Sequence, residues 1–217
     1  MTVRRPPARA RSLGSRLPMP GQFALPGFEA PMPAPTDRLL FLLRPDAQAA
    51  ARVAALVQRL FTGHGQRGLA GVPVPVPLLH VTLHELGVYA GVPNDVVARA
   101  SAAATAVSMR QFNVSFDAAT RFSPEQSRHP FVLTGGEGVI GCALLHEALG
   151  TALRDVGFRV GSASGYTPHL TLARGDDGAS DFPVEPPIAW TVSEFLLVHS
   201  LIGQRRHVVL GRWRLAQ

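Results

Sequence analysis

The tripeptide His-x-Thr occurs twice in the sequence, and each copy sets an imidazole two residues away from a hydroxyl. The copies are His80-Val81-Thr82 and His169-Leu170-Thr171, and their histidines are 89 residues apart (169 − 80). Because alternate residues of a strand face the same side, each copy would present its histidine and threonine on one face and its apolar residue on the other. One copy is common on exposed strands, whereas two copies with matching apolar alternates predict one shared site.

Two imidazoles and two hydroxyls in one cleft would suit the hydrolysis of a cyclic phosphate. One histidine takes a proton from the attacking water, and the other protonates the leaving oxygen on the far side of phosphorus. The hydroxyls hold the non-bridging oxygens in line, so this chemistry needs no metal or other cofactor. A zinc site built from His80, His84 and His169 is the alternative, although no carboxylate lies in the same motif.

The apolar pattern predicts the elements that would position these residues. The two motifs lie in predicted strands at residues 78–83 and 166–172. Further strands are predicted at 39–43, 112–116, 131–133, 188–198 and 207–215, and helices after Asp46, from Pro93 and over 139–156. Asp46 is expected to cap the first helix, and Gly157 to end the third. The alternating Val and Pro residues at 72–77 should be extended, because proline excludes helix.

The order strand, helix, His-x-Thr strand occurs at residues 39–83 and again at 131–172. This repetition predicts an internal duplication. We therefore expect an α+β fold of two similar lobes, in which antiparallel sheets face a central cleft and helices lie on the outside.

The composition separates a basic N-terminal arm, residues 1–36, from one domain at 37–217. The arm is rich in Pro, Arg, Ala and Gly and should be mostly flexible. Its segment Phe23–Phe28 is expected to dock on the chain's own surface or on a partner. The formal net charge is +6, and all the basic residues are arginines, which bind phosphate in a bidentate manner.

Several classes of protein are disfavoured by the sequence. No apolar run reaches the roughly 18–20 residues of a membrane-spanning helix, and no signal peptide is recognised. The single cysteine, Cys142, excludes an internal disulfide and a cysteine-based metal cage. It lies in an apolar helical pattern and should be a buried, inert thiol. We expect a cytoplasmic, monomeric protein that does not bind membranes.

The two motifs and their flanks resemble the bacterial and archaeal 2′-5′ RNA ligase family, also called RNA 2′,3′-cyclic phosphodiesterases, within the two-histidine (2H) phosphoesterases. The family signature is two His-x-Thr/Ser-x tetrapeptides, which read His80-Val81-Thr82-Leu83 and His169-Leu170-Thr171-Leu172 here. Similar flanks are Arg38–Pro45 in the opening strand, Leu86-Gly87, Pro168, Ala173-Arg174, and Trp213 with Leu215 in the closing strand. The resemblance covers about residues 37–217.

This resemblance implies the hydrolysis of 2′,3′-cyclic phosphates at RNA ends to 2′-phosphomonoesters and, by reversal, 2′-5′ ligation of RNA such as tRNA halves. His80 and His169 would be the acid and the base, and the resemblance favours His169 as the base. Thr82 and Thr171 would bind the phosphate, and Arg174 would neutralise its charge.

Three further residues, His84, His199 and Tyr166, are candidates for substrate contact, and His207 is a departure from the family. His84 stands where the family has an apolar or small residue, and strand alternation would place it on the same side as His80. His207 stands where many relatives carry an aromatic residue, commonly Tyr, on the base-binding side. His199 ends a predicted strand, and Tyr166 precedes the second motif.

Two other functions remain open from the sequence. A non-catalytic protein that binds RNA ends would need phosphate donors but not two titrating imidazoles. A hydrolase of a small cyclic nucleotide would use the same residues, and only a series of substrates of increasing length separates it from an RNA enzyme.

Overall fold

The computed structural model describes residues 35–62, 71–122, 129–161, 164–175 and 180–217. The N-terminal arm predicted at 1–36 lies outside these residues except for Pro35 and Thr36, and so does its segment Phe23–Phe28. Among the described helices, none is long and apolar enough to cross a membrane.

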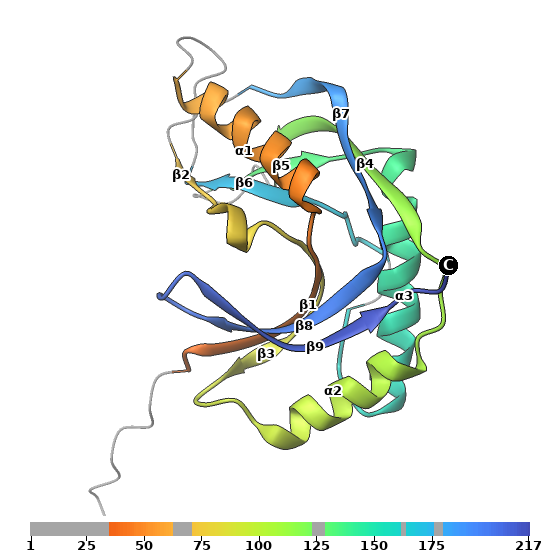
Figure 1. The fold of residues 1–217 in the computed structure, drawn as a ribbon. Helices are drawn as coiled ribbons and strands as arrows, with labels where there is room; N and C mark the ends of the chain where they lie inside the picture. The colour runs from red at the N-terminus through yellow and green to blue at the C-terminus, as the bar shows by residue number, and fades with distance from the viewer. Residues whose placement is uncertain (1–34, 63–70, 123–128, 162–163, 176–179) are drawn as a thin grey trace, which may run out of the picture. The chain divides into compact units, whose positions relative to one another are not determined.

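Nine strands of the described residues form one antiparallel sheet in the order β7-β4-β5-β6-β3-β1-β8-β9, with β2 paired to β6 (Figure 1). The strands are β1 (Asp37–Leu43), β2 (Val72–Pro73), β3 (Val81–Tyr89), β4 (Phe112–Arg121), β5 (Phe131–Thr134), β6 (Leu170–Arg174), β7 (Phe182–Val192), β8 (Glu194–Leu201) and β9 (Arg206–Arg214).

The sheet consists of two halves that meet along β3 and β6. These two strands are paired at a single position, Val81 opposite Leu170. One half is β7-β4-β5-β6 and the other is β3-β1-β8-β9. The predicted repeat occurs along the chain as β1-α1-β3 and β5-α3-β6, with the strands of each copy in one half, although α1 packs against β7 of the other half. The expected α+β fold with two duplicated lobes is thus confirmed, and the two motif strands are neighbours at the junction of the lobes.

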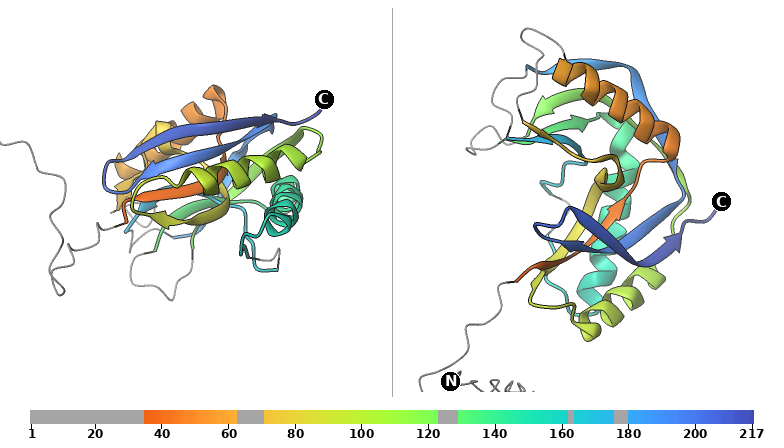
Figure 2. Two further views of the ribbon diagram at one scale, coloured as in Figure 1. Left: turned by 90° about the horizontal axis from the view of Figure 1, so that it is seen from below. Right: turned by 60° about the vertical axis from the view of Figure 1, so that its left-hand side comes forward.

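Three α-helices of the described residues cover the strands: α1 (Ala47–Thr62), α2 (Asn94–Ala106) and α3 (Ile140–Asp155). Asp46 caps α1 as predicted, since its carboxylate accepts a hydrogen bond from the Ala49 amide at 2.7 Å. Gly157 adopts a φ of 87° just beyond α3, a conformation that glycine tolerates at a helix end. The two views of Figure 2 show α2 and α3 together on one side of the fold and α1 at the other end, against β7.

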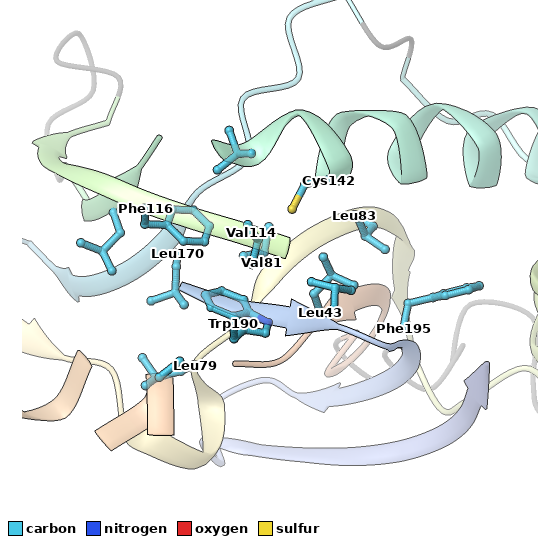
Figure 3. Close-up of a cluster of buried hydrophobic side chains, with 14 of the residues drawn as sticks. Leu43, Leu79, Val81, Leu83, Val114, Phe116, Cys142, Leu170, Trp190 and Phe195 are labelled. Carbon is cyan, nitrogen blue, oxygen red and sulfur yellow. The ribbon is translucent and has the colours of Figure 1, made fainter. Parts of the chain in front are cut away.

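The core lies between α3 and the junction of the two halves. Val81 and Leu170 are fully buried, and Leu83 is almost so. Figure 3 shows Cys142 of α3 pointing towards these side chains. Burial raises the pKa of the Cys142 thiol to about 12, so it stays protonated and inert as expected. Burying each of these aliphatic side chains contributes roughly 1.5–3 kcal/mol and decides which face of each motif strand turns inwards.

Several predicted boundaries were wrong. The strands β3 and β6 begin at Val81 and Leu170, so both motif histidines stand just before their strands. The proline-rich segment is only partly extended, because residues Val76–Leu78 form a short 3-10 helix. Pro77 is tolerated near the start of this turn, where no amide hydrogen bond is required.

The strand predicted at 188–198 is in fact the end of β7 and the start of β8, separated at Ser193. Because β7 belongs to one half of the sheet and β8 to the other, the chain crosses between the halves at this residue. A continuous apolar pattern cannot reveal such a crossing.

Candidate active site

The register at the junction brings the two His-x-Thr motifs together. Val81 lies opposite Leu170 in an antiparallel pair, so the pattern of antiparallel pairing sets His80 beside Thr171 and Thr82 beside His169. All four side chains are partly exposed, whereas the apolar residues between them are buried. Each lobe therefore contributes one imidazole and faces it with a hydroxyl of the other lobe.

Both motif histidines are held by the same hydrogen bond. The Nδ1 atom of His80 lies 2.6 Å from the carbonyl oxygen of Leu78, and that of His169 lies 2.8 Å from the carbonyl oxygen of Thr167. A carbonyl only accepts, so Nδ1 must carry the hydrogen in both rings. In the neutral tautomer this leaves Nε2 without a proton and able to accept one. Both rings are thus oriented for proton transfer at Nε2.

The surroundings of His80 are basic and largely closed. Burial lowers the pKa of His80, and Coulombic interactions with Arg174, His169 and Arg44 lower it further, whereas the hydrogen bond that its Nδ1 donates to the Leu78 carbonyl raises it. His169 acts electrostatically on His80 because the two rings lie near each other.

His207 of β9 packs edge-on against His80, with the ring centroids 5.3 Å apart. Burial lowers the pKa of His207 to about 4, with smaller contributions from His80 and Arg44. His207 is therefore neutral at pH 7 and serves as an aromatic wall beside His80.

His169 has different neighbours. Its ring stacks on Phe122, with centroids 4.3 Å apart and planes inclined by 24°. Tyr166, three residues upstream, donates a hydrogen bond to the carbonyl oxygen of Thr82 at 2.8 Å. The Tyr166 ring also stacks on His146 of α3 at 3.9 Å. The segment before β6 is thus fastened both to the first motif and to α3, and Tyr166 contacts the protein's own backbone.

His84 lies apart from the other motif residues. Its side chain is 4% exposed and stacks on His146, and its Nε2 donates to the His146 carbonyl oxygen at 2.7 Å. In the pairing of β1 with β3, Leu42 lies opposite Thr82 and Phe41 opposite His84. Leu83 is therefore an extra residue in a β-bulge, and the alternation that would have turned His84 towards His80 is broken. His84 is therefore buried against α3 and does not face the cleft, so the prediction that it contacts substrate was wrong.

The zinc alternative loses its ligand set for the same reason, because His84 packs under α3 while His80 and His169 lie on the open face. In the part of the chain that the structure describes, no group of three or more His, Cys, Asp or Glu side chains is placed to hold a metal ion.

His199 makes a structural hydrogen bond to Asp37. Its Nε2 lies 2.6 Å from Oδ1 of Asp37, and both side chains are 13% exposed. The Gly91 amide also donates to Asp37 and is the main cause that lowers the pKa of this carboxyl. His199 thus fastens β8 to the start of β1.

A pocket of about 390 Å³ opens beside His80, between the segment before β3 and the hairpin that joins β8 to β9. His80 and His207 line it, and so does Arg174, whose side chain is exposed at the end of β6. The remaining basic residues of its wall are Arg38, Arg205 and Arg206.

Comparison with known proteins identifies the family. The sequence profile of the 2′-5′ RNA ligase superfamily matches residues 45–201, well over half of the chain. The chain belongs to the 2′-5′ RNA ligase superfamily. The expected membership in the 2H phosphoesterases is thus confirmed, and with it a phosphodiesterase or ligase type of enzyme. No curated protein sequence matches the chain.

Several solved structures share this fold. The apo structure of Escherichia coli LigT is 24% identical over 85% of this chain and 100% of LigT, with a TM-score of 0.67. A crystal structure described as a phosphoesterase is 24% identical over 83% and 99% of the two chains, with a TM-score of 0.68. TT0787 of Thermus thermophilus is 20% identical over 82% and 97%, with a TM-score of 0.65.

Sequence reasoning missed several residues around the motifs. Phe122 reaches His169 only because β4 and β6 flank β5 in the sheet, and no local pattern announces that pairing. Arg205 and Arg206 come from a hairpin more than 30 residues after the second motif. Their tandem basic character was the only signal that could have drawn attention to them.

Proposed function

We propose that this protein hydrolyses 2′,3′-cyclic phosphates at RNA ends to 2′-phosphomonoesters without a metal ion. Water attacks phosphorus and the bond to the 3′ oxygen breaks, which leaves a 2′-phosphate and a 3′ hydroxyl. One histidine accepts the proton of the water, and the other gives a proton to the departing oxygen. His80 and His169 take these roles, and Thr82 and Thr171 hold the phosphate, with Arg174 as a neighbouring cation.

The single observation that supports this proposal most strongly is the matched pair of Nδ1 hydrogen bonds. His80 and His169 each donate to the carbonyl two residues upstream, so both Nε2 atoms are available at neighbouring positions across the β3–β6 junction. A protein that only bound phosphate would gain more from permanent cations than from two neutral rings held in this tautomer.

The pocket suggests how the two roles are divided. In-line attack sets the water and the leaving oxygen on opposite sides of phosphorus. The 3′ oxygen stays attached to the ribose after cleavage, so the acid must lie beside the bound nucleoside. His80 lines the pocket and His169 does not, which supports His80 as the acid and His169 as the base.

The acid must be protonated, yet burial lowers the pKa of His80 in the ligand-free protein. A bound cyclic phosphate carries a negative charge close to this ring. An opposite charge within a few ångströms favours the charged imidazolium, so substrate binding is expected to raise the pKa of His80 and protonate it where the proton is needed.

The nucleotide ligands of a structural relative agree with this proposal. E. coli LigT has been crystallised with 3′-AMP and with ATP. The same two histidines would also serve the reverse reaction, in which the 5′ hydroxyl of a second RNA replaces water and forms a 2′-5′ linkage.

The test is incubation of the full-length protein with an oligoribonucleotide that ends in a 2′,3′-cyclic phosphate, in buffer with EDTA, followed by assignment of the product by ³¹P NMR. We expect a 2′-phosphomonoester at an undiminished rate. Loss of activity in EDTA would indicate a metal-dependent mechanism instead. Tight binding without turnover would indicate the non-catalytic binder, and turnover of mononucleotides alone would indicate a small-molecule hydrolase.

A further inference from the structure

The pocket beside His80 is strongly basic. Four arginines line it, namely Arg38, Arg174, Arg205 and Arg206, together with the rings of His80 and His207. No aspartate or glutamate is among its described lining residues. The rest of the wall is mainly aliphatic, from the segment 72–78 on one side and Leu201 with Ile202 on the other. A pocket of about 390 Å³ with apolar walls and convergent cations suits a nucleotide.

The arginines come from two walls of this pocket. Arg174 ends β6, directly after the second motif, and Val72 of the opposite strand β2 pairs with it. Arg205 and Arg206 line the other wall, on the hairpin between β8 and β9. The pocket therefore has one cationic wall beside the motifs and a second at the β8–β9 hairpin.

The β8–β9 hairpin, which forms the second cationic wall with Arg205 and Arg206, has an unusual backbone conformation. Arg205 has a φ of 50°, in the left-handed region that residues other than glycine and asparagine rarely adopt. Its guanidinium donates to the carbonyl oxygen of Pro73 at 3.1 Å, which joins the hairpin wall of the pocket to the wall formed by residues 72–78. This contact fixes the distance between the two walls and leaves further N–H groups of Arg205 for a ligand.

Arg206, the neighbour of Arg205, is exposed and has no ion-pair partner among the described residues. By contrast, Arg38 is paired with Glu85 at 3.5 Å. A single cyclic phosphate at the motifs carries one negative charge, which Arg174 is placed to offset. The two arginines of the hairpin exceed what that one group needs.

We propose that Arg205 and Arg206 form a second phosphate subsite, which holds the phosphodiester on the 5′ side of the terminal nucleotide. This inference rests on the proposed function, since it assumes that a cyclic phosphate occupies the motifs. The terminal nucleoside then lies along the aliphatic walls between the two phosphates. The preferred substrate is accordingly an RNA end of at least two nucleotides over a mononucleoside cyclic phosphate.

Three substrates separate the contribution of the second phosphate from that of the second nucleoside. They are adenosine 2′,3′-cyclic phosphate, the dinucleotide ApA 2′,3′-cyclic phosphate, and the same dinucleotide with an uncharged methylphosphonate linkage. For the full-length protein, kcat/KM should be about tenfold or more higher for the charged dinucleotide than for the other two, as expected for a charge-assisted phosphate contact. Equal values for the two dinucleotides would overturn the subsite.

Variants locate the effect. Arg206→Ala and the double variant R205A/R206A should bring the ratio of the charged dinucleotide to the mononucleotide close to one. Arg214→Ala is the matched control, because Arg214 is an exposed arginine of the same strand outside the pocket, and it should leave the ratio at its wild-type value. A ratio that survives R205A/R206A would contradict the assignment.

Failure of the proposed function gives a different result, namely no hydrolysis of any of the three substrates. In that case the Kd values of 2′-AMP and of ApA 2′-phosphate decide the subsite by themselves. Tighter binding of the dinucleotide that is lost in R205A/R206A would support it. Equal Kd values would overturn it.

Discussion

The two His-x-Thr motifs share their internal geometry but differ in their surroundings. In both, Nδ1 donates to the carbonyl two residues upstream and the residue after the histidine is buried. His80, however, lies against His207 and lines the arginine-rich pocket. His169 lies against Phe122, and the segment before it is fastened by Tyr166.

In the proposed mechanism the motif itself provides the proton-transfer groups, and this contrast leads us to propose that the neighbours decide the side on which each histidine acts. Because the motif is duplicated, the histidine of each copy is equally able to accept or donate a proton at Nε2. We propose that the nucleoside binds on the His80 side, because His80 and not His169 lines the pocket with its arginines. Substitutions in the two copies should show whether their histidines and threonines contribute equally to the rate, and substitutions of their neighbours should show where the copies differ.

Replacing either His80 or His169 with alanine should give the largest loss, roughly 10²–10⁴-fold in kcat, because each replacement removes one acid or base. The double variant should lose far less than the product of the two single losses, since the residues act as a unit. Single-turnover rates on a cyclic-phosphate dinucleotide measure both effects. Two independent, multiplicative losses would show that the histidines do not share one phosphate.

Replacing Thr82 or Thr171 with valine removes a hydroxyl and keeps the shape of the side chain. Each change should lower kcat/KM by roughly 10–100-fold, as expected for about 1–3 kcal/mol from one lost hydrogen bond to a charged group. Because each threonine faces the histidine of the other strand, the two losses should be similar. Serine at either position should restore most of the rate, and a loss confined to one threonine would break the symmetry of the pair.

Tyr166→Phe removes the hydroxyl that joins the second motif to Thr82 while it keeps the stack on His146. We expect kcat to fall by about three- to tenfold with little change in KM, since one neutral hydrogen bond contributes about 1 kcal/mol. Tyr89→Phe is the matched control, because the Tyr89 hydroxyl also donates to a backbone carbonyl at 2.8 Å, that of Leu86. If both variants lose the same activity, Tyr166 has no positioning role.

Stability should fall in acid because of the buried ring stack beside the second motif. Burial, with smaller contributions from His84 and Arg154, lowers the pKa of His146 to about 4, against about 6.5 in the unfolded chain. Between these values the unfolded state binds a proton that the native state does not, so stability is lost as the pH falls from 6.5 towards 4.

The measurement is the thermal midpoint between pH 7.5 and pH 5. It should decrease over this range, and His146→Phe, which keeps an aromatic ring between His84 and Tyr166, should make the decrease smaller. An identical pH dependence in the variant would show that His146 is not the titrating group.

Deletion of residues 1–36 should have the smallest effect on chemistry, because the arm contains no histidine and lies outside both motifs. Turnover of a dinucleotide cyclic phosphate should stay within a few-fold of the full-length rate. Affinity for long RNA should fall and become less sensitive to salt, since the arm contributes arginines that contact phosphates. A loss above about tenfold on the dinucleotide would show that the arm takes part in building the site.

Much of the fold could be predicted because its signals are local. The apolar residues that alternate with the histidines fixed the buried face of both motif strands, and Asp46 and Gly157 marked helix ends through their own capping geometry. The predictions that were wrong concerned features that depend on pairing between strands distant in the sequence. The bulge at Leu83, which turned His84 under α3, arises from the register of β3 against β1, and no periodicity within β3 contains it.

The site shows the same division. The motif residues could be named from their types and spacing, because the chemistry requires those groups. The residues around them could not, since Phe122 and the arginines of the β8–β9 hairpin reach the motifs only through sheet order and a turn. The asymmetry between the two copies is therefore a property of the tertiary structure.

The most direct test of that asymmetry uses a cyclic substrate in which sulfur replaces the leaving 3′ oxygen, because a thiolate departs without receiving a proton. We expect that His80→Ala, which lacks the acid, hydrolyses this substrate within about tenfold of the wild-type rate. His169→Ala, which lacks the base, should remain as slow as it is on the oxygen substrate. Rescue of His169→Ala in place of His80→Ala, or rescue of neither, would contradict the assignment of the nucleoside side to His80 and the water side to His169.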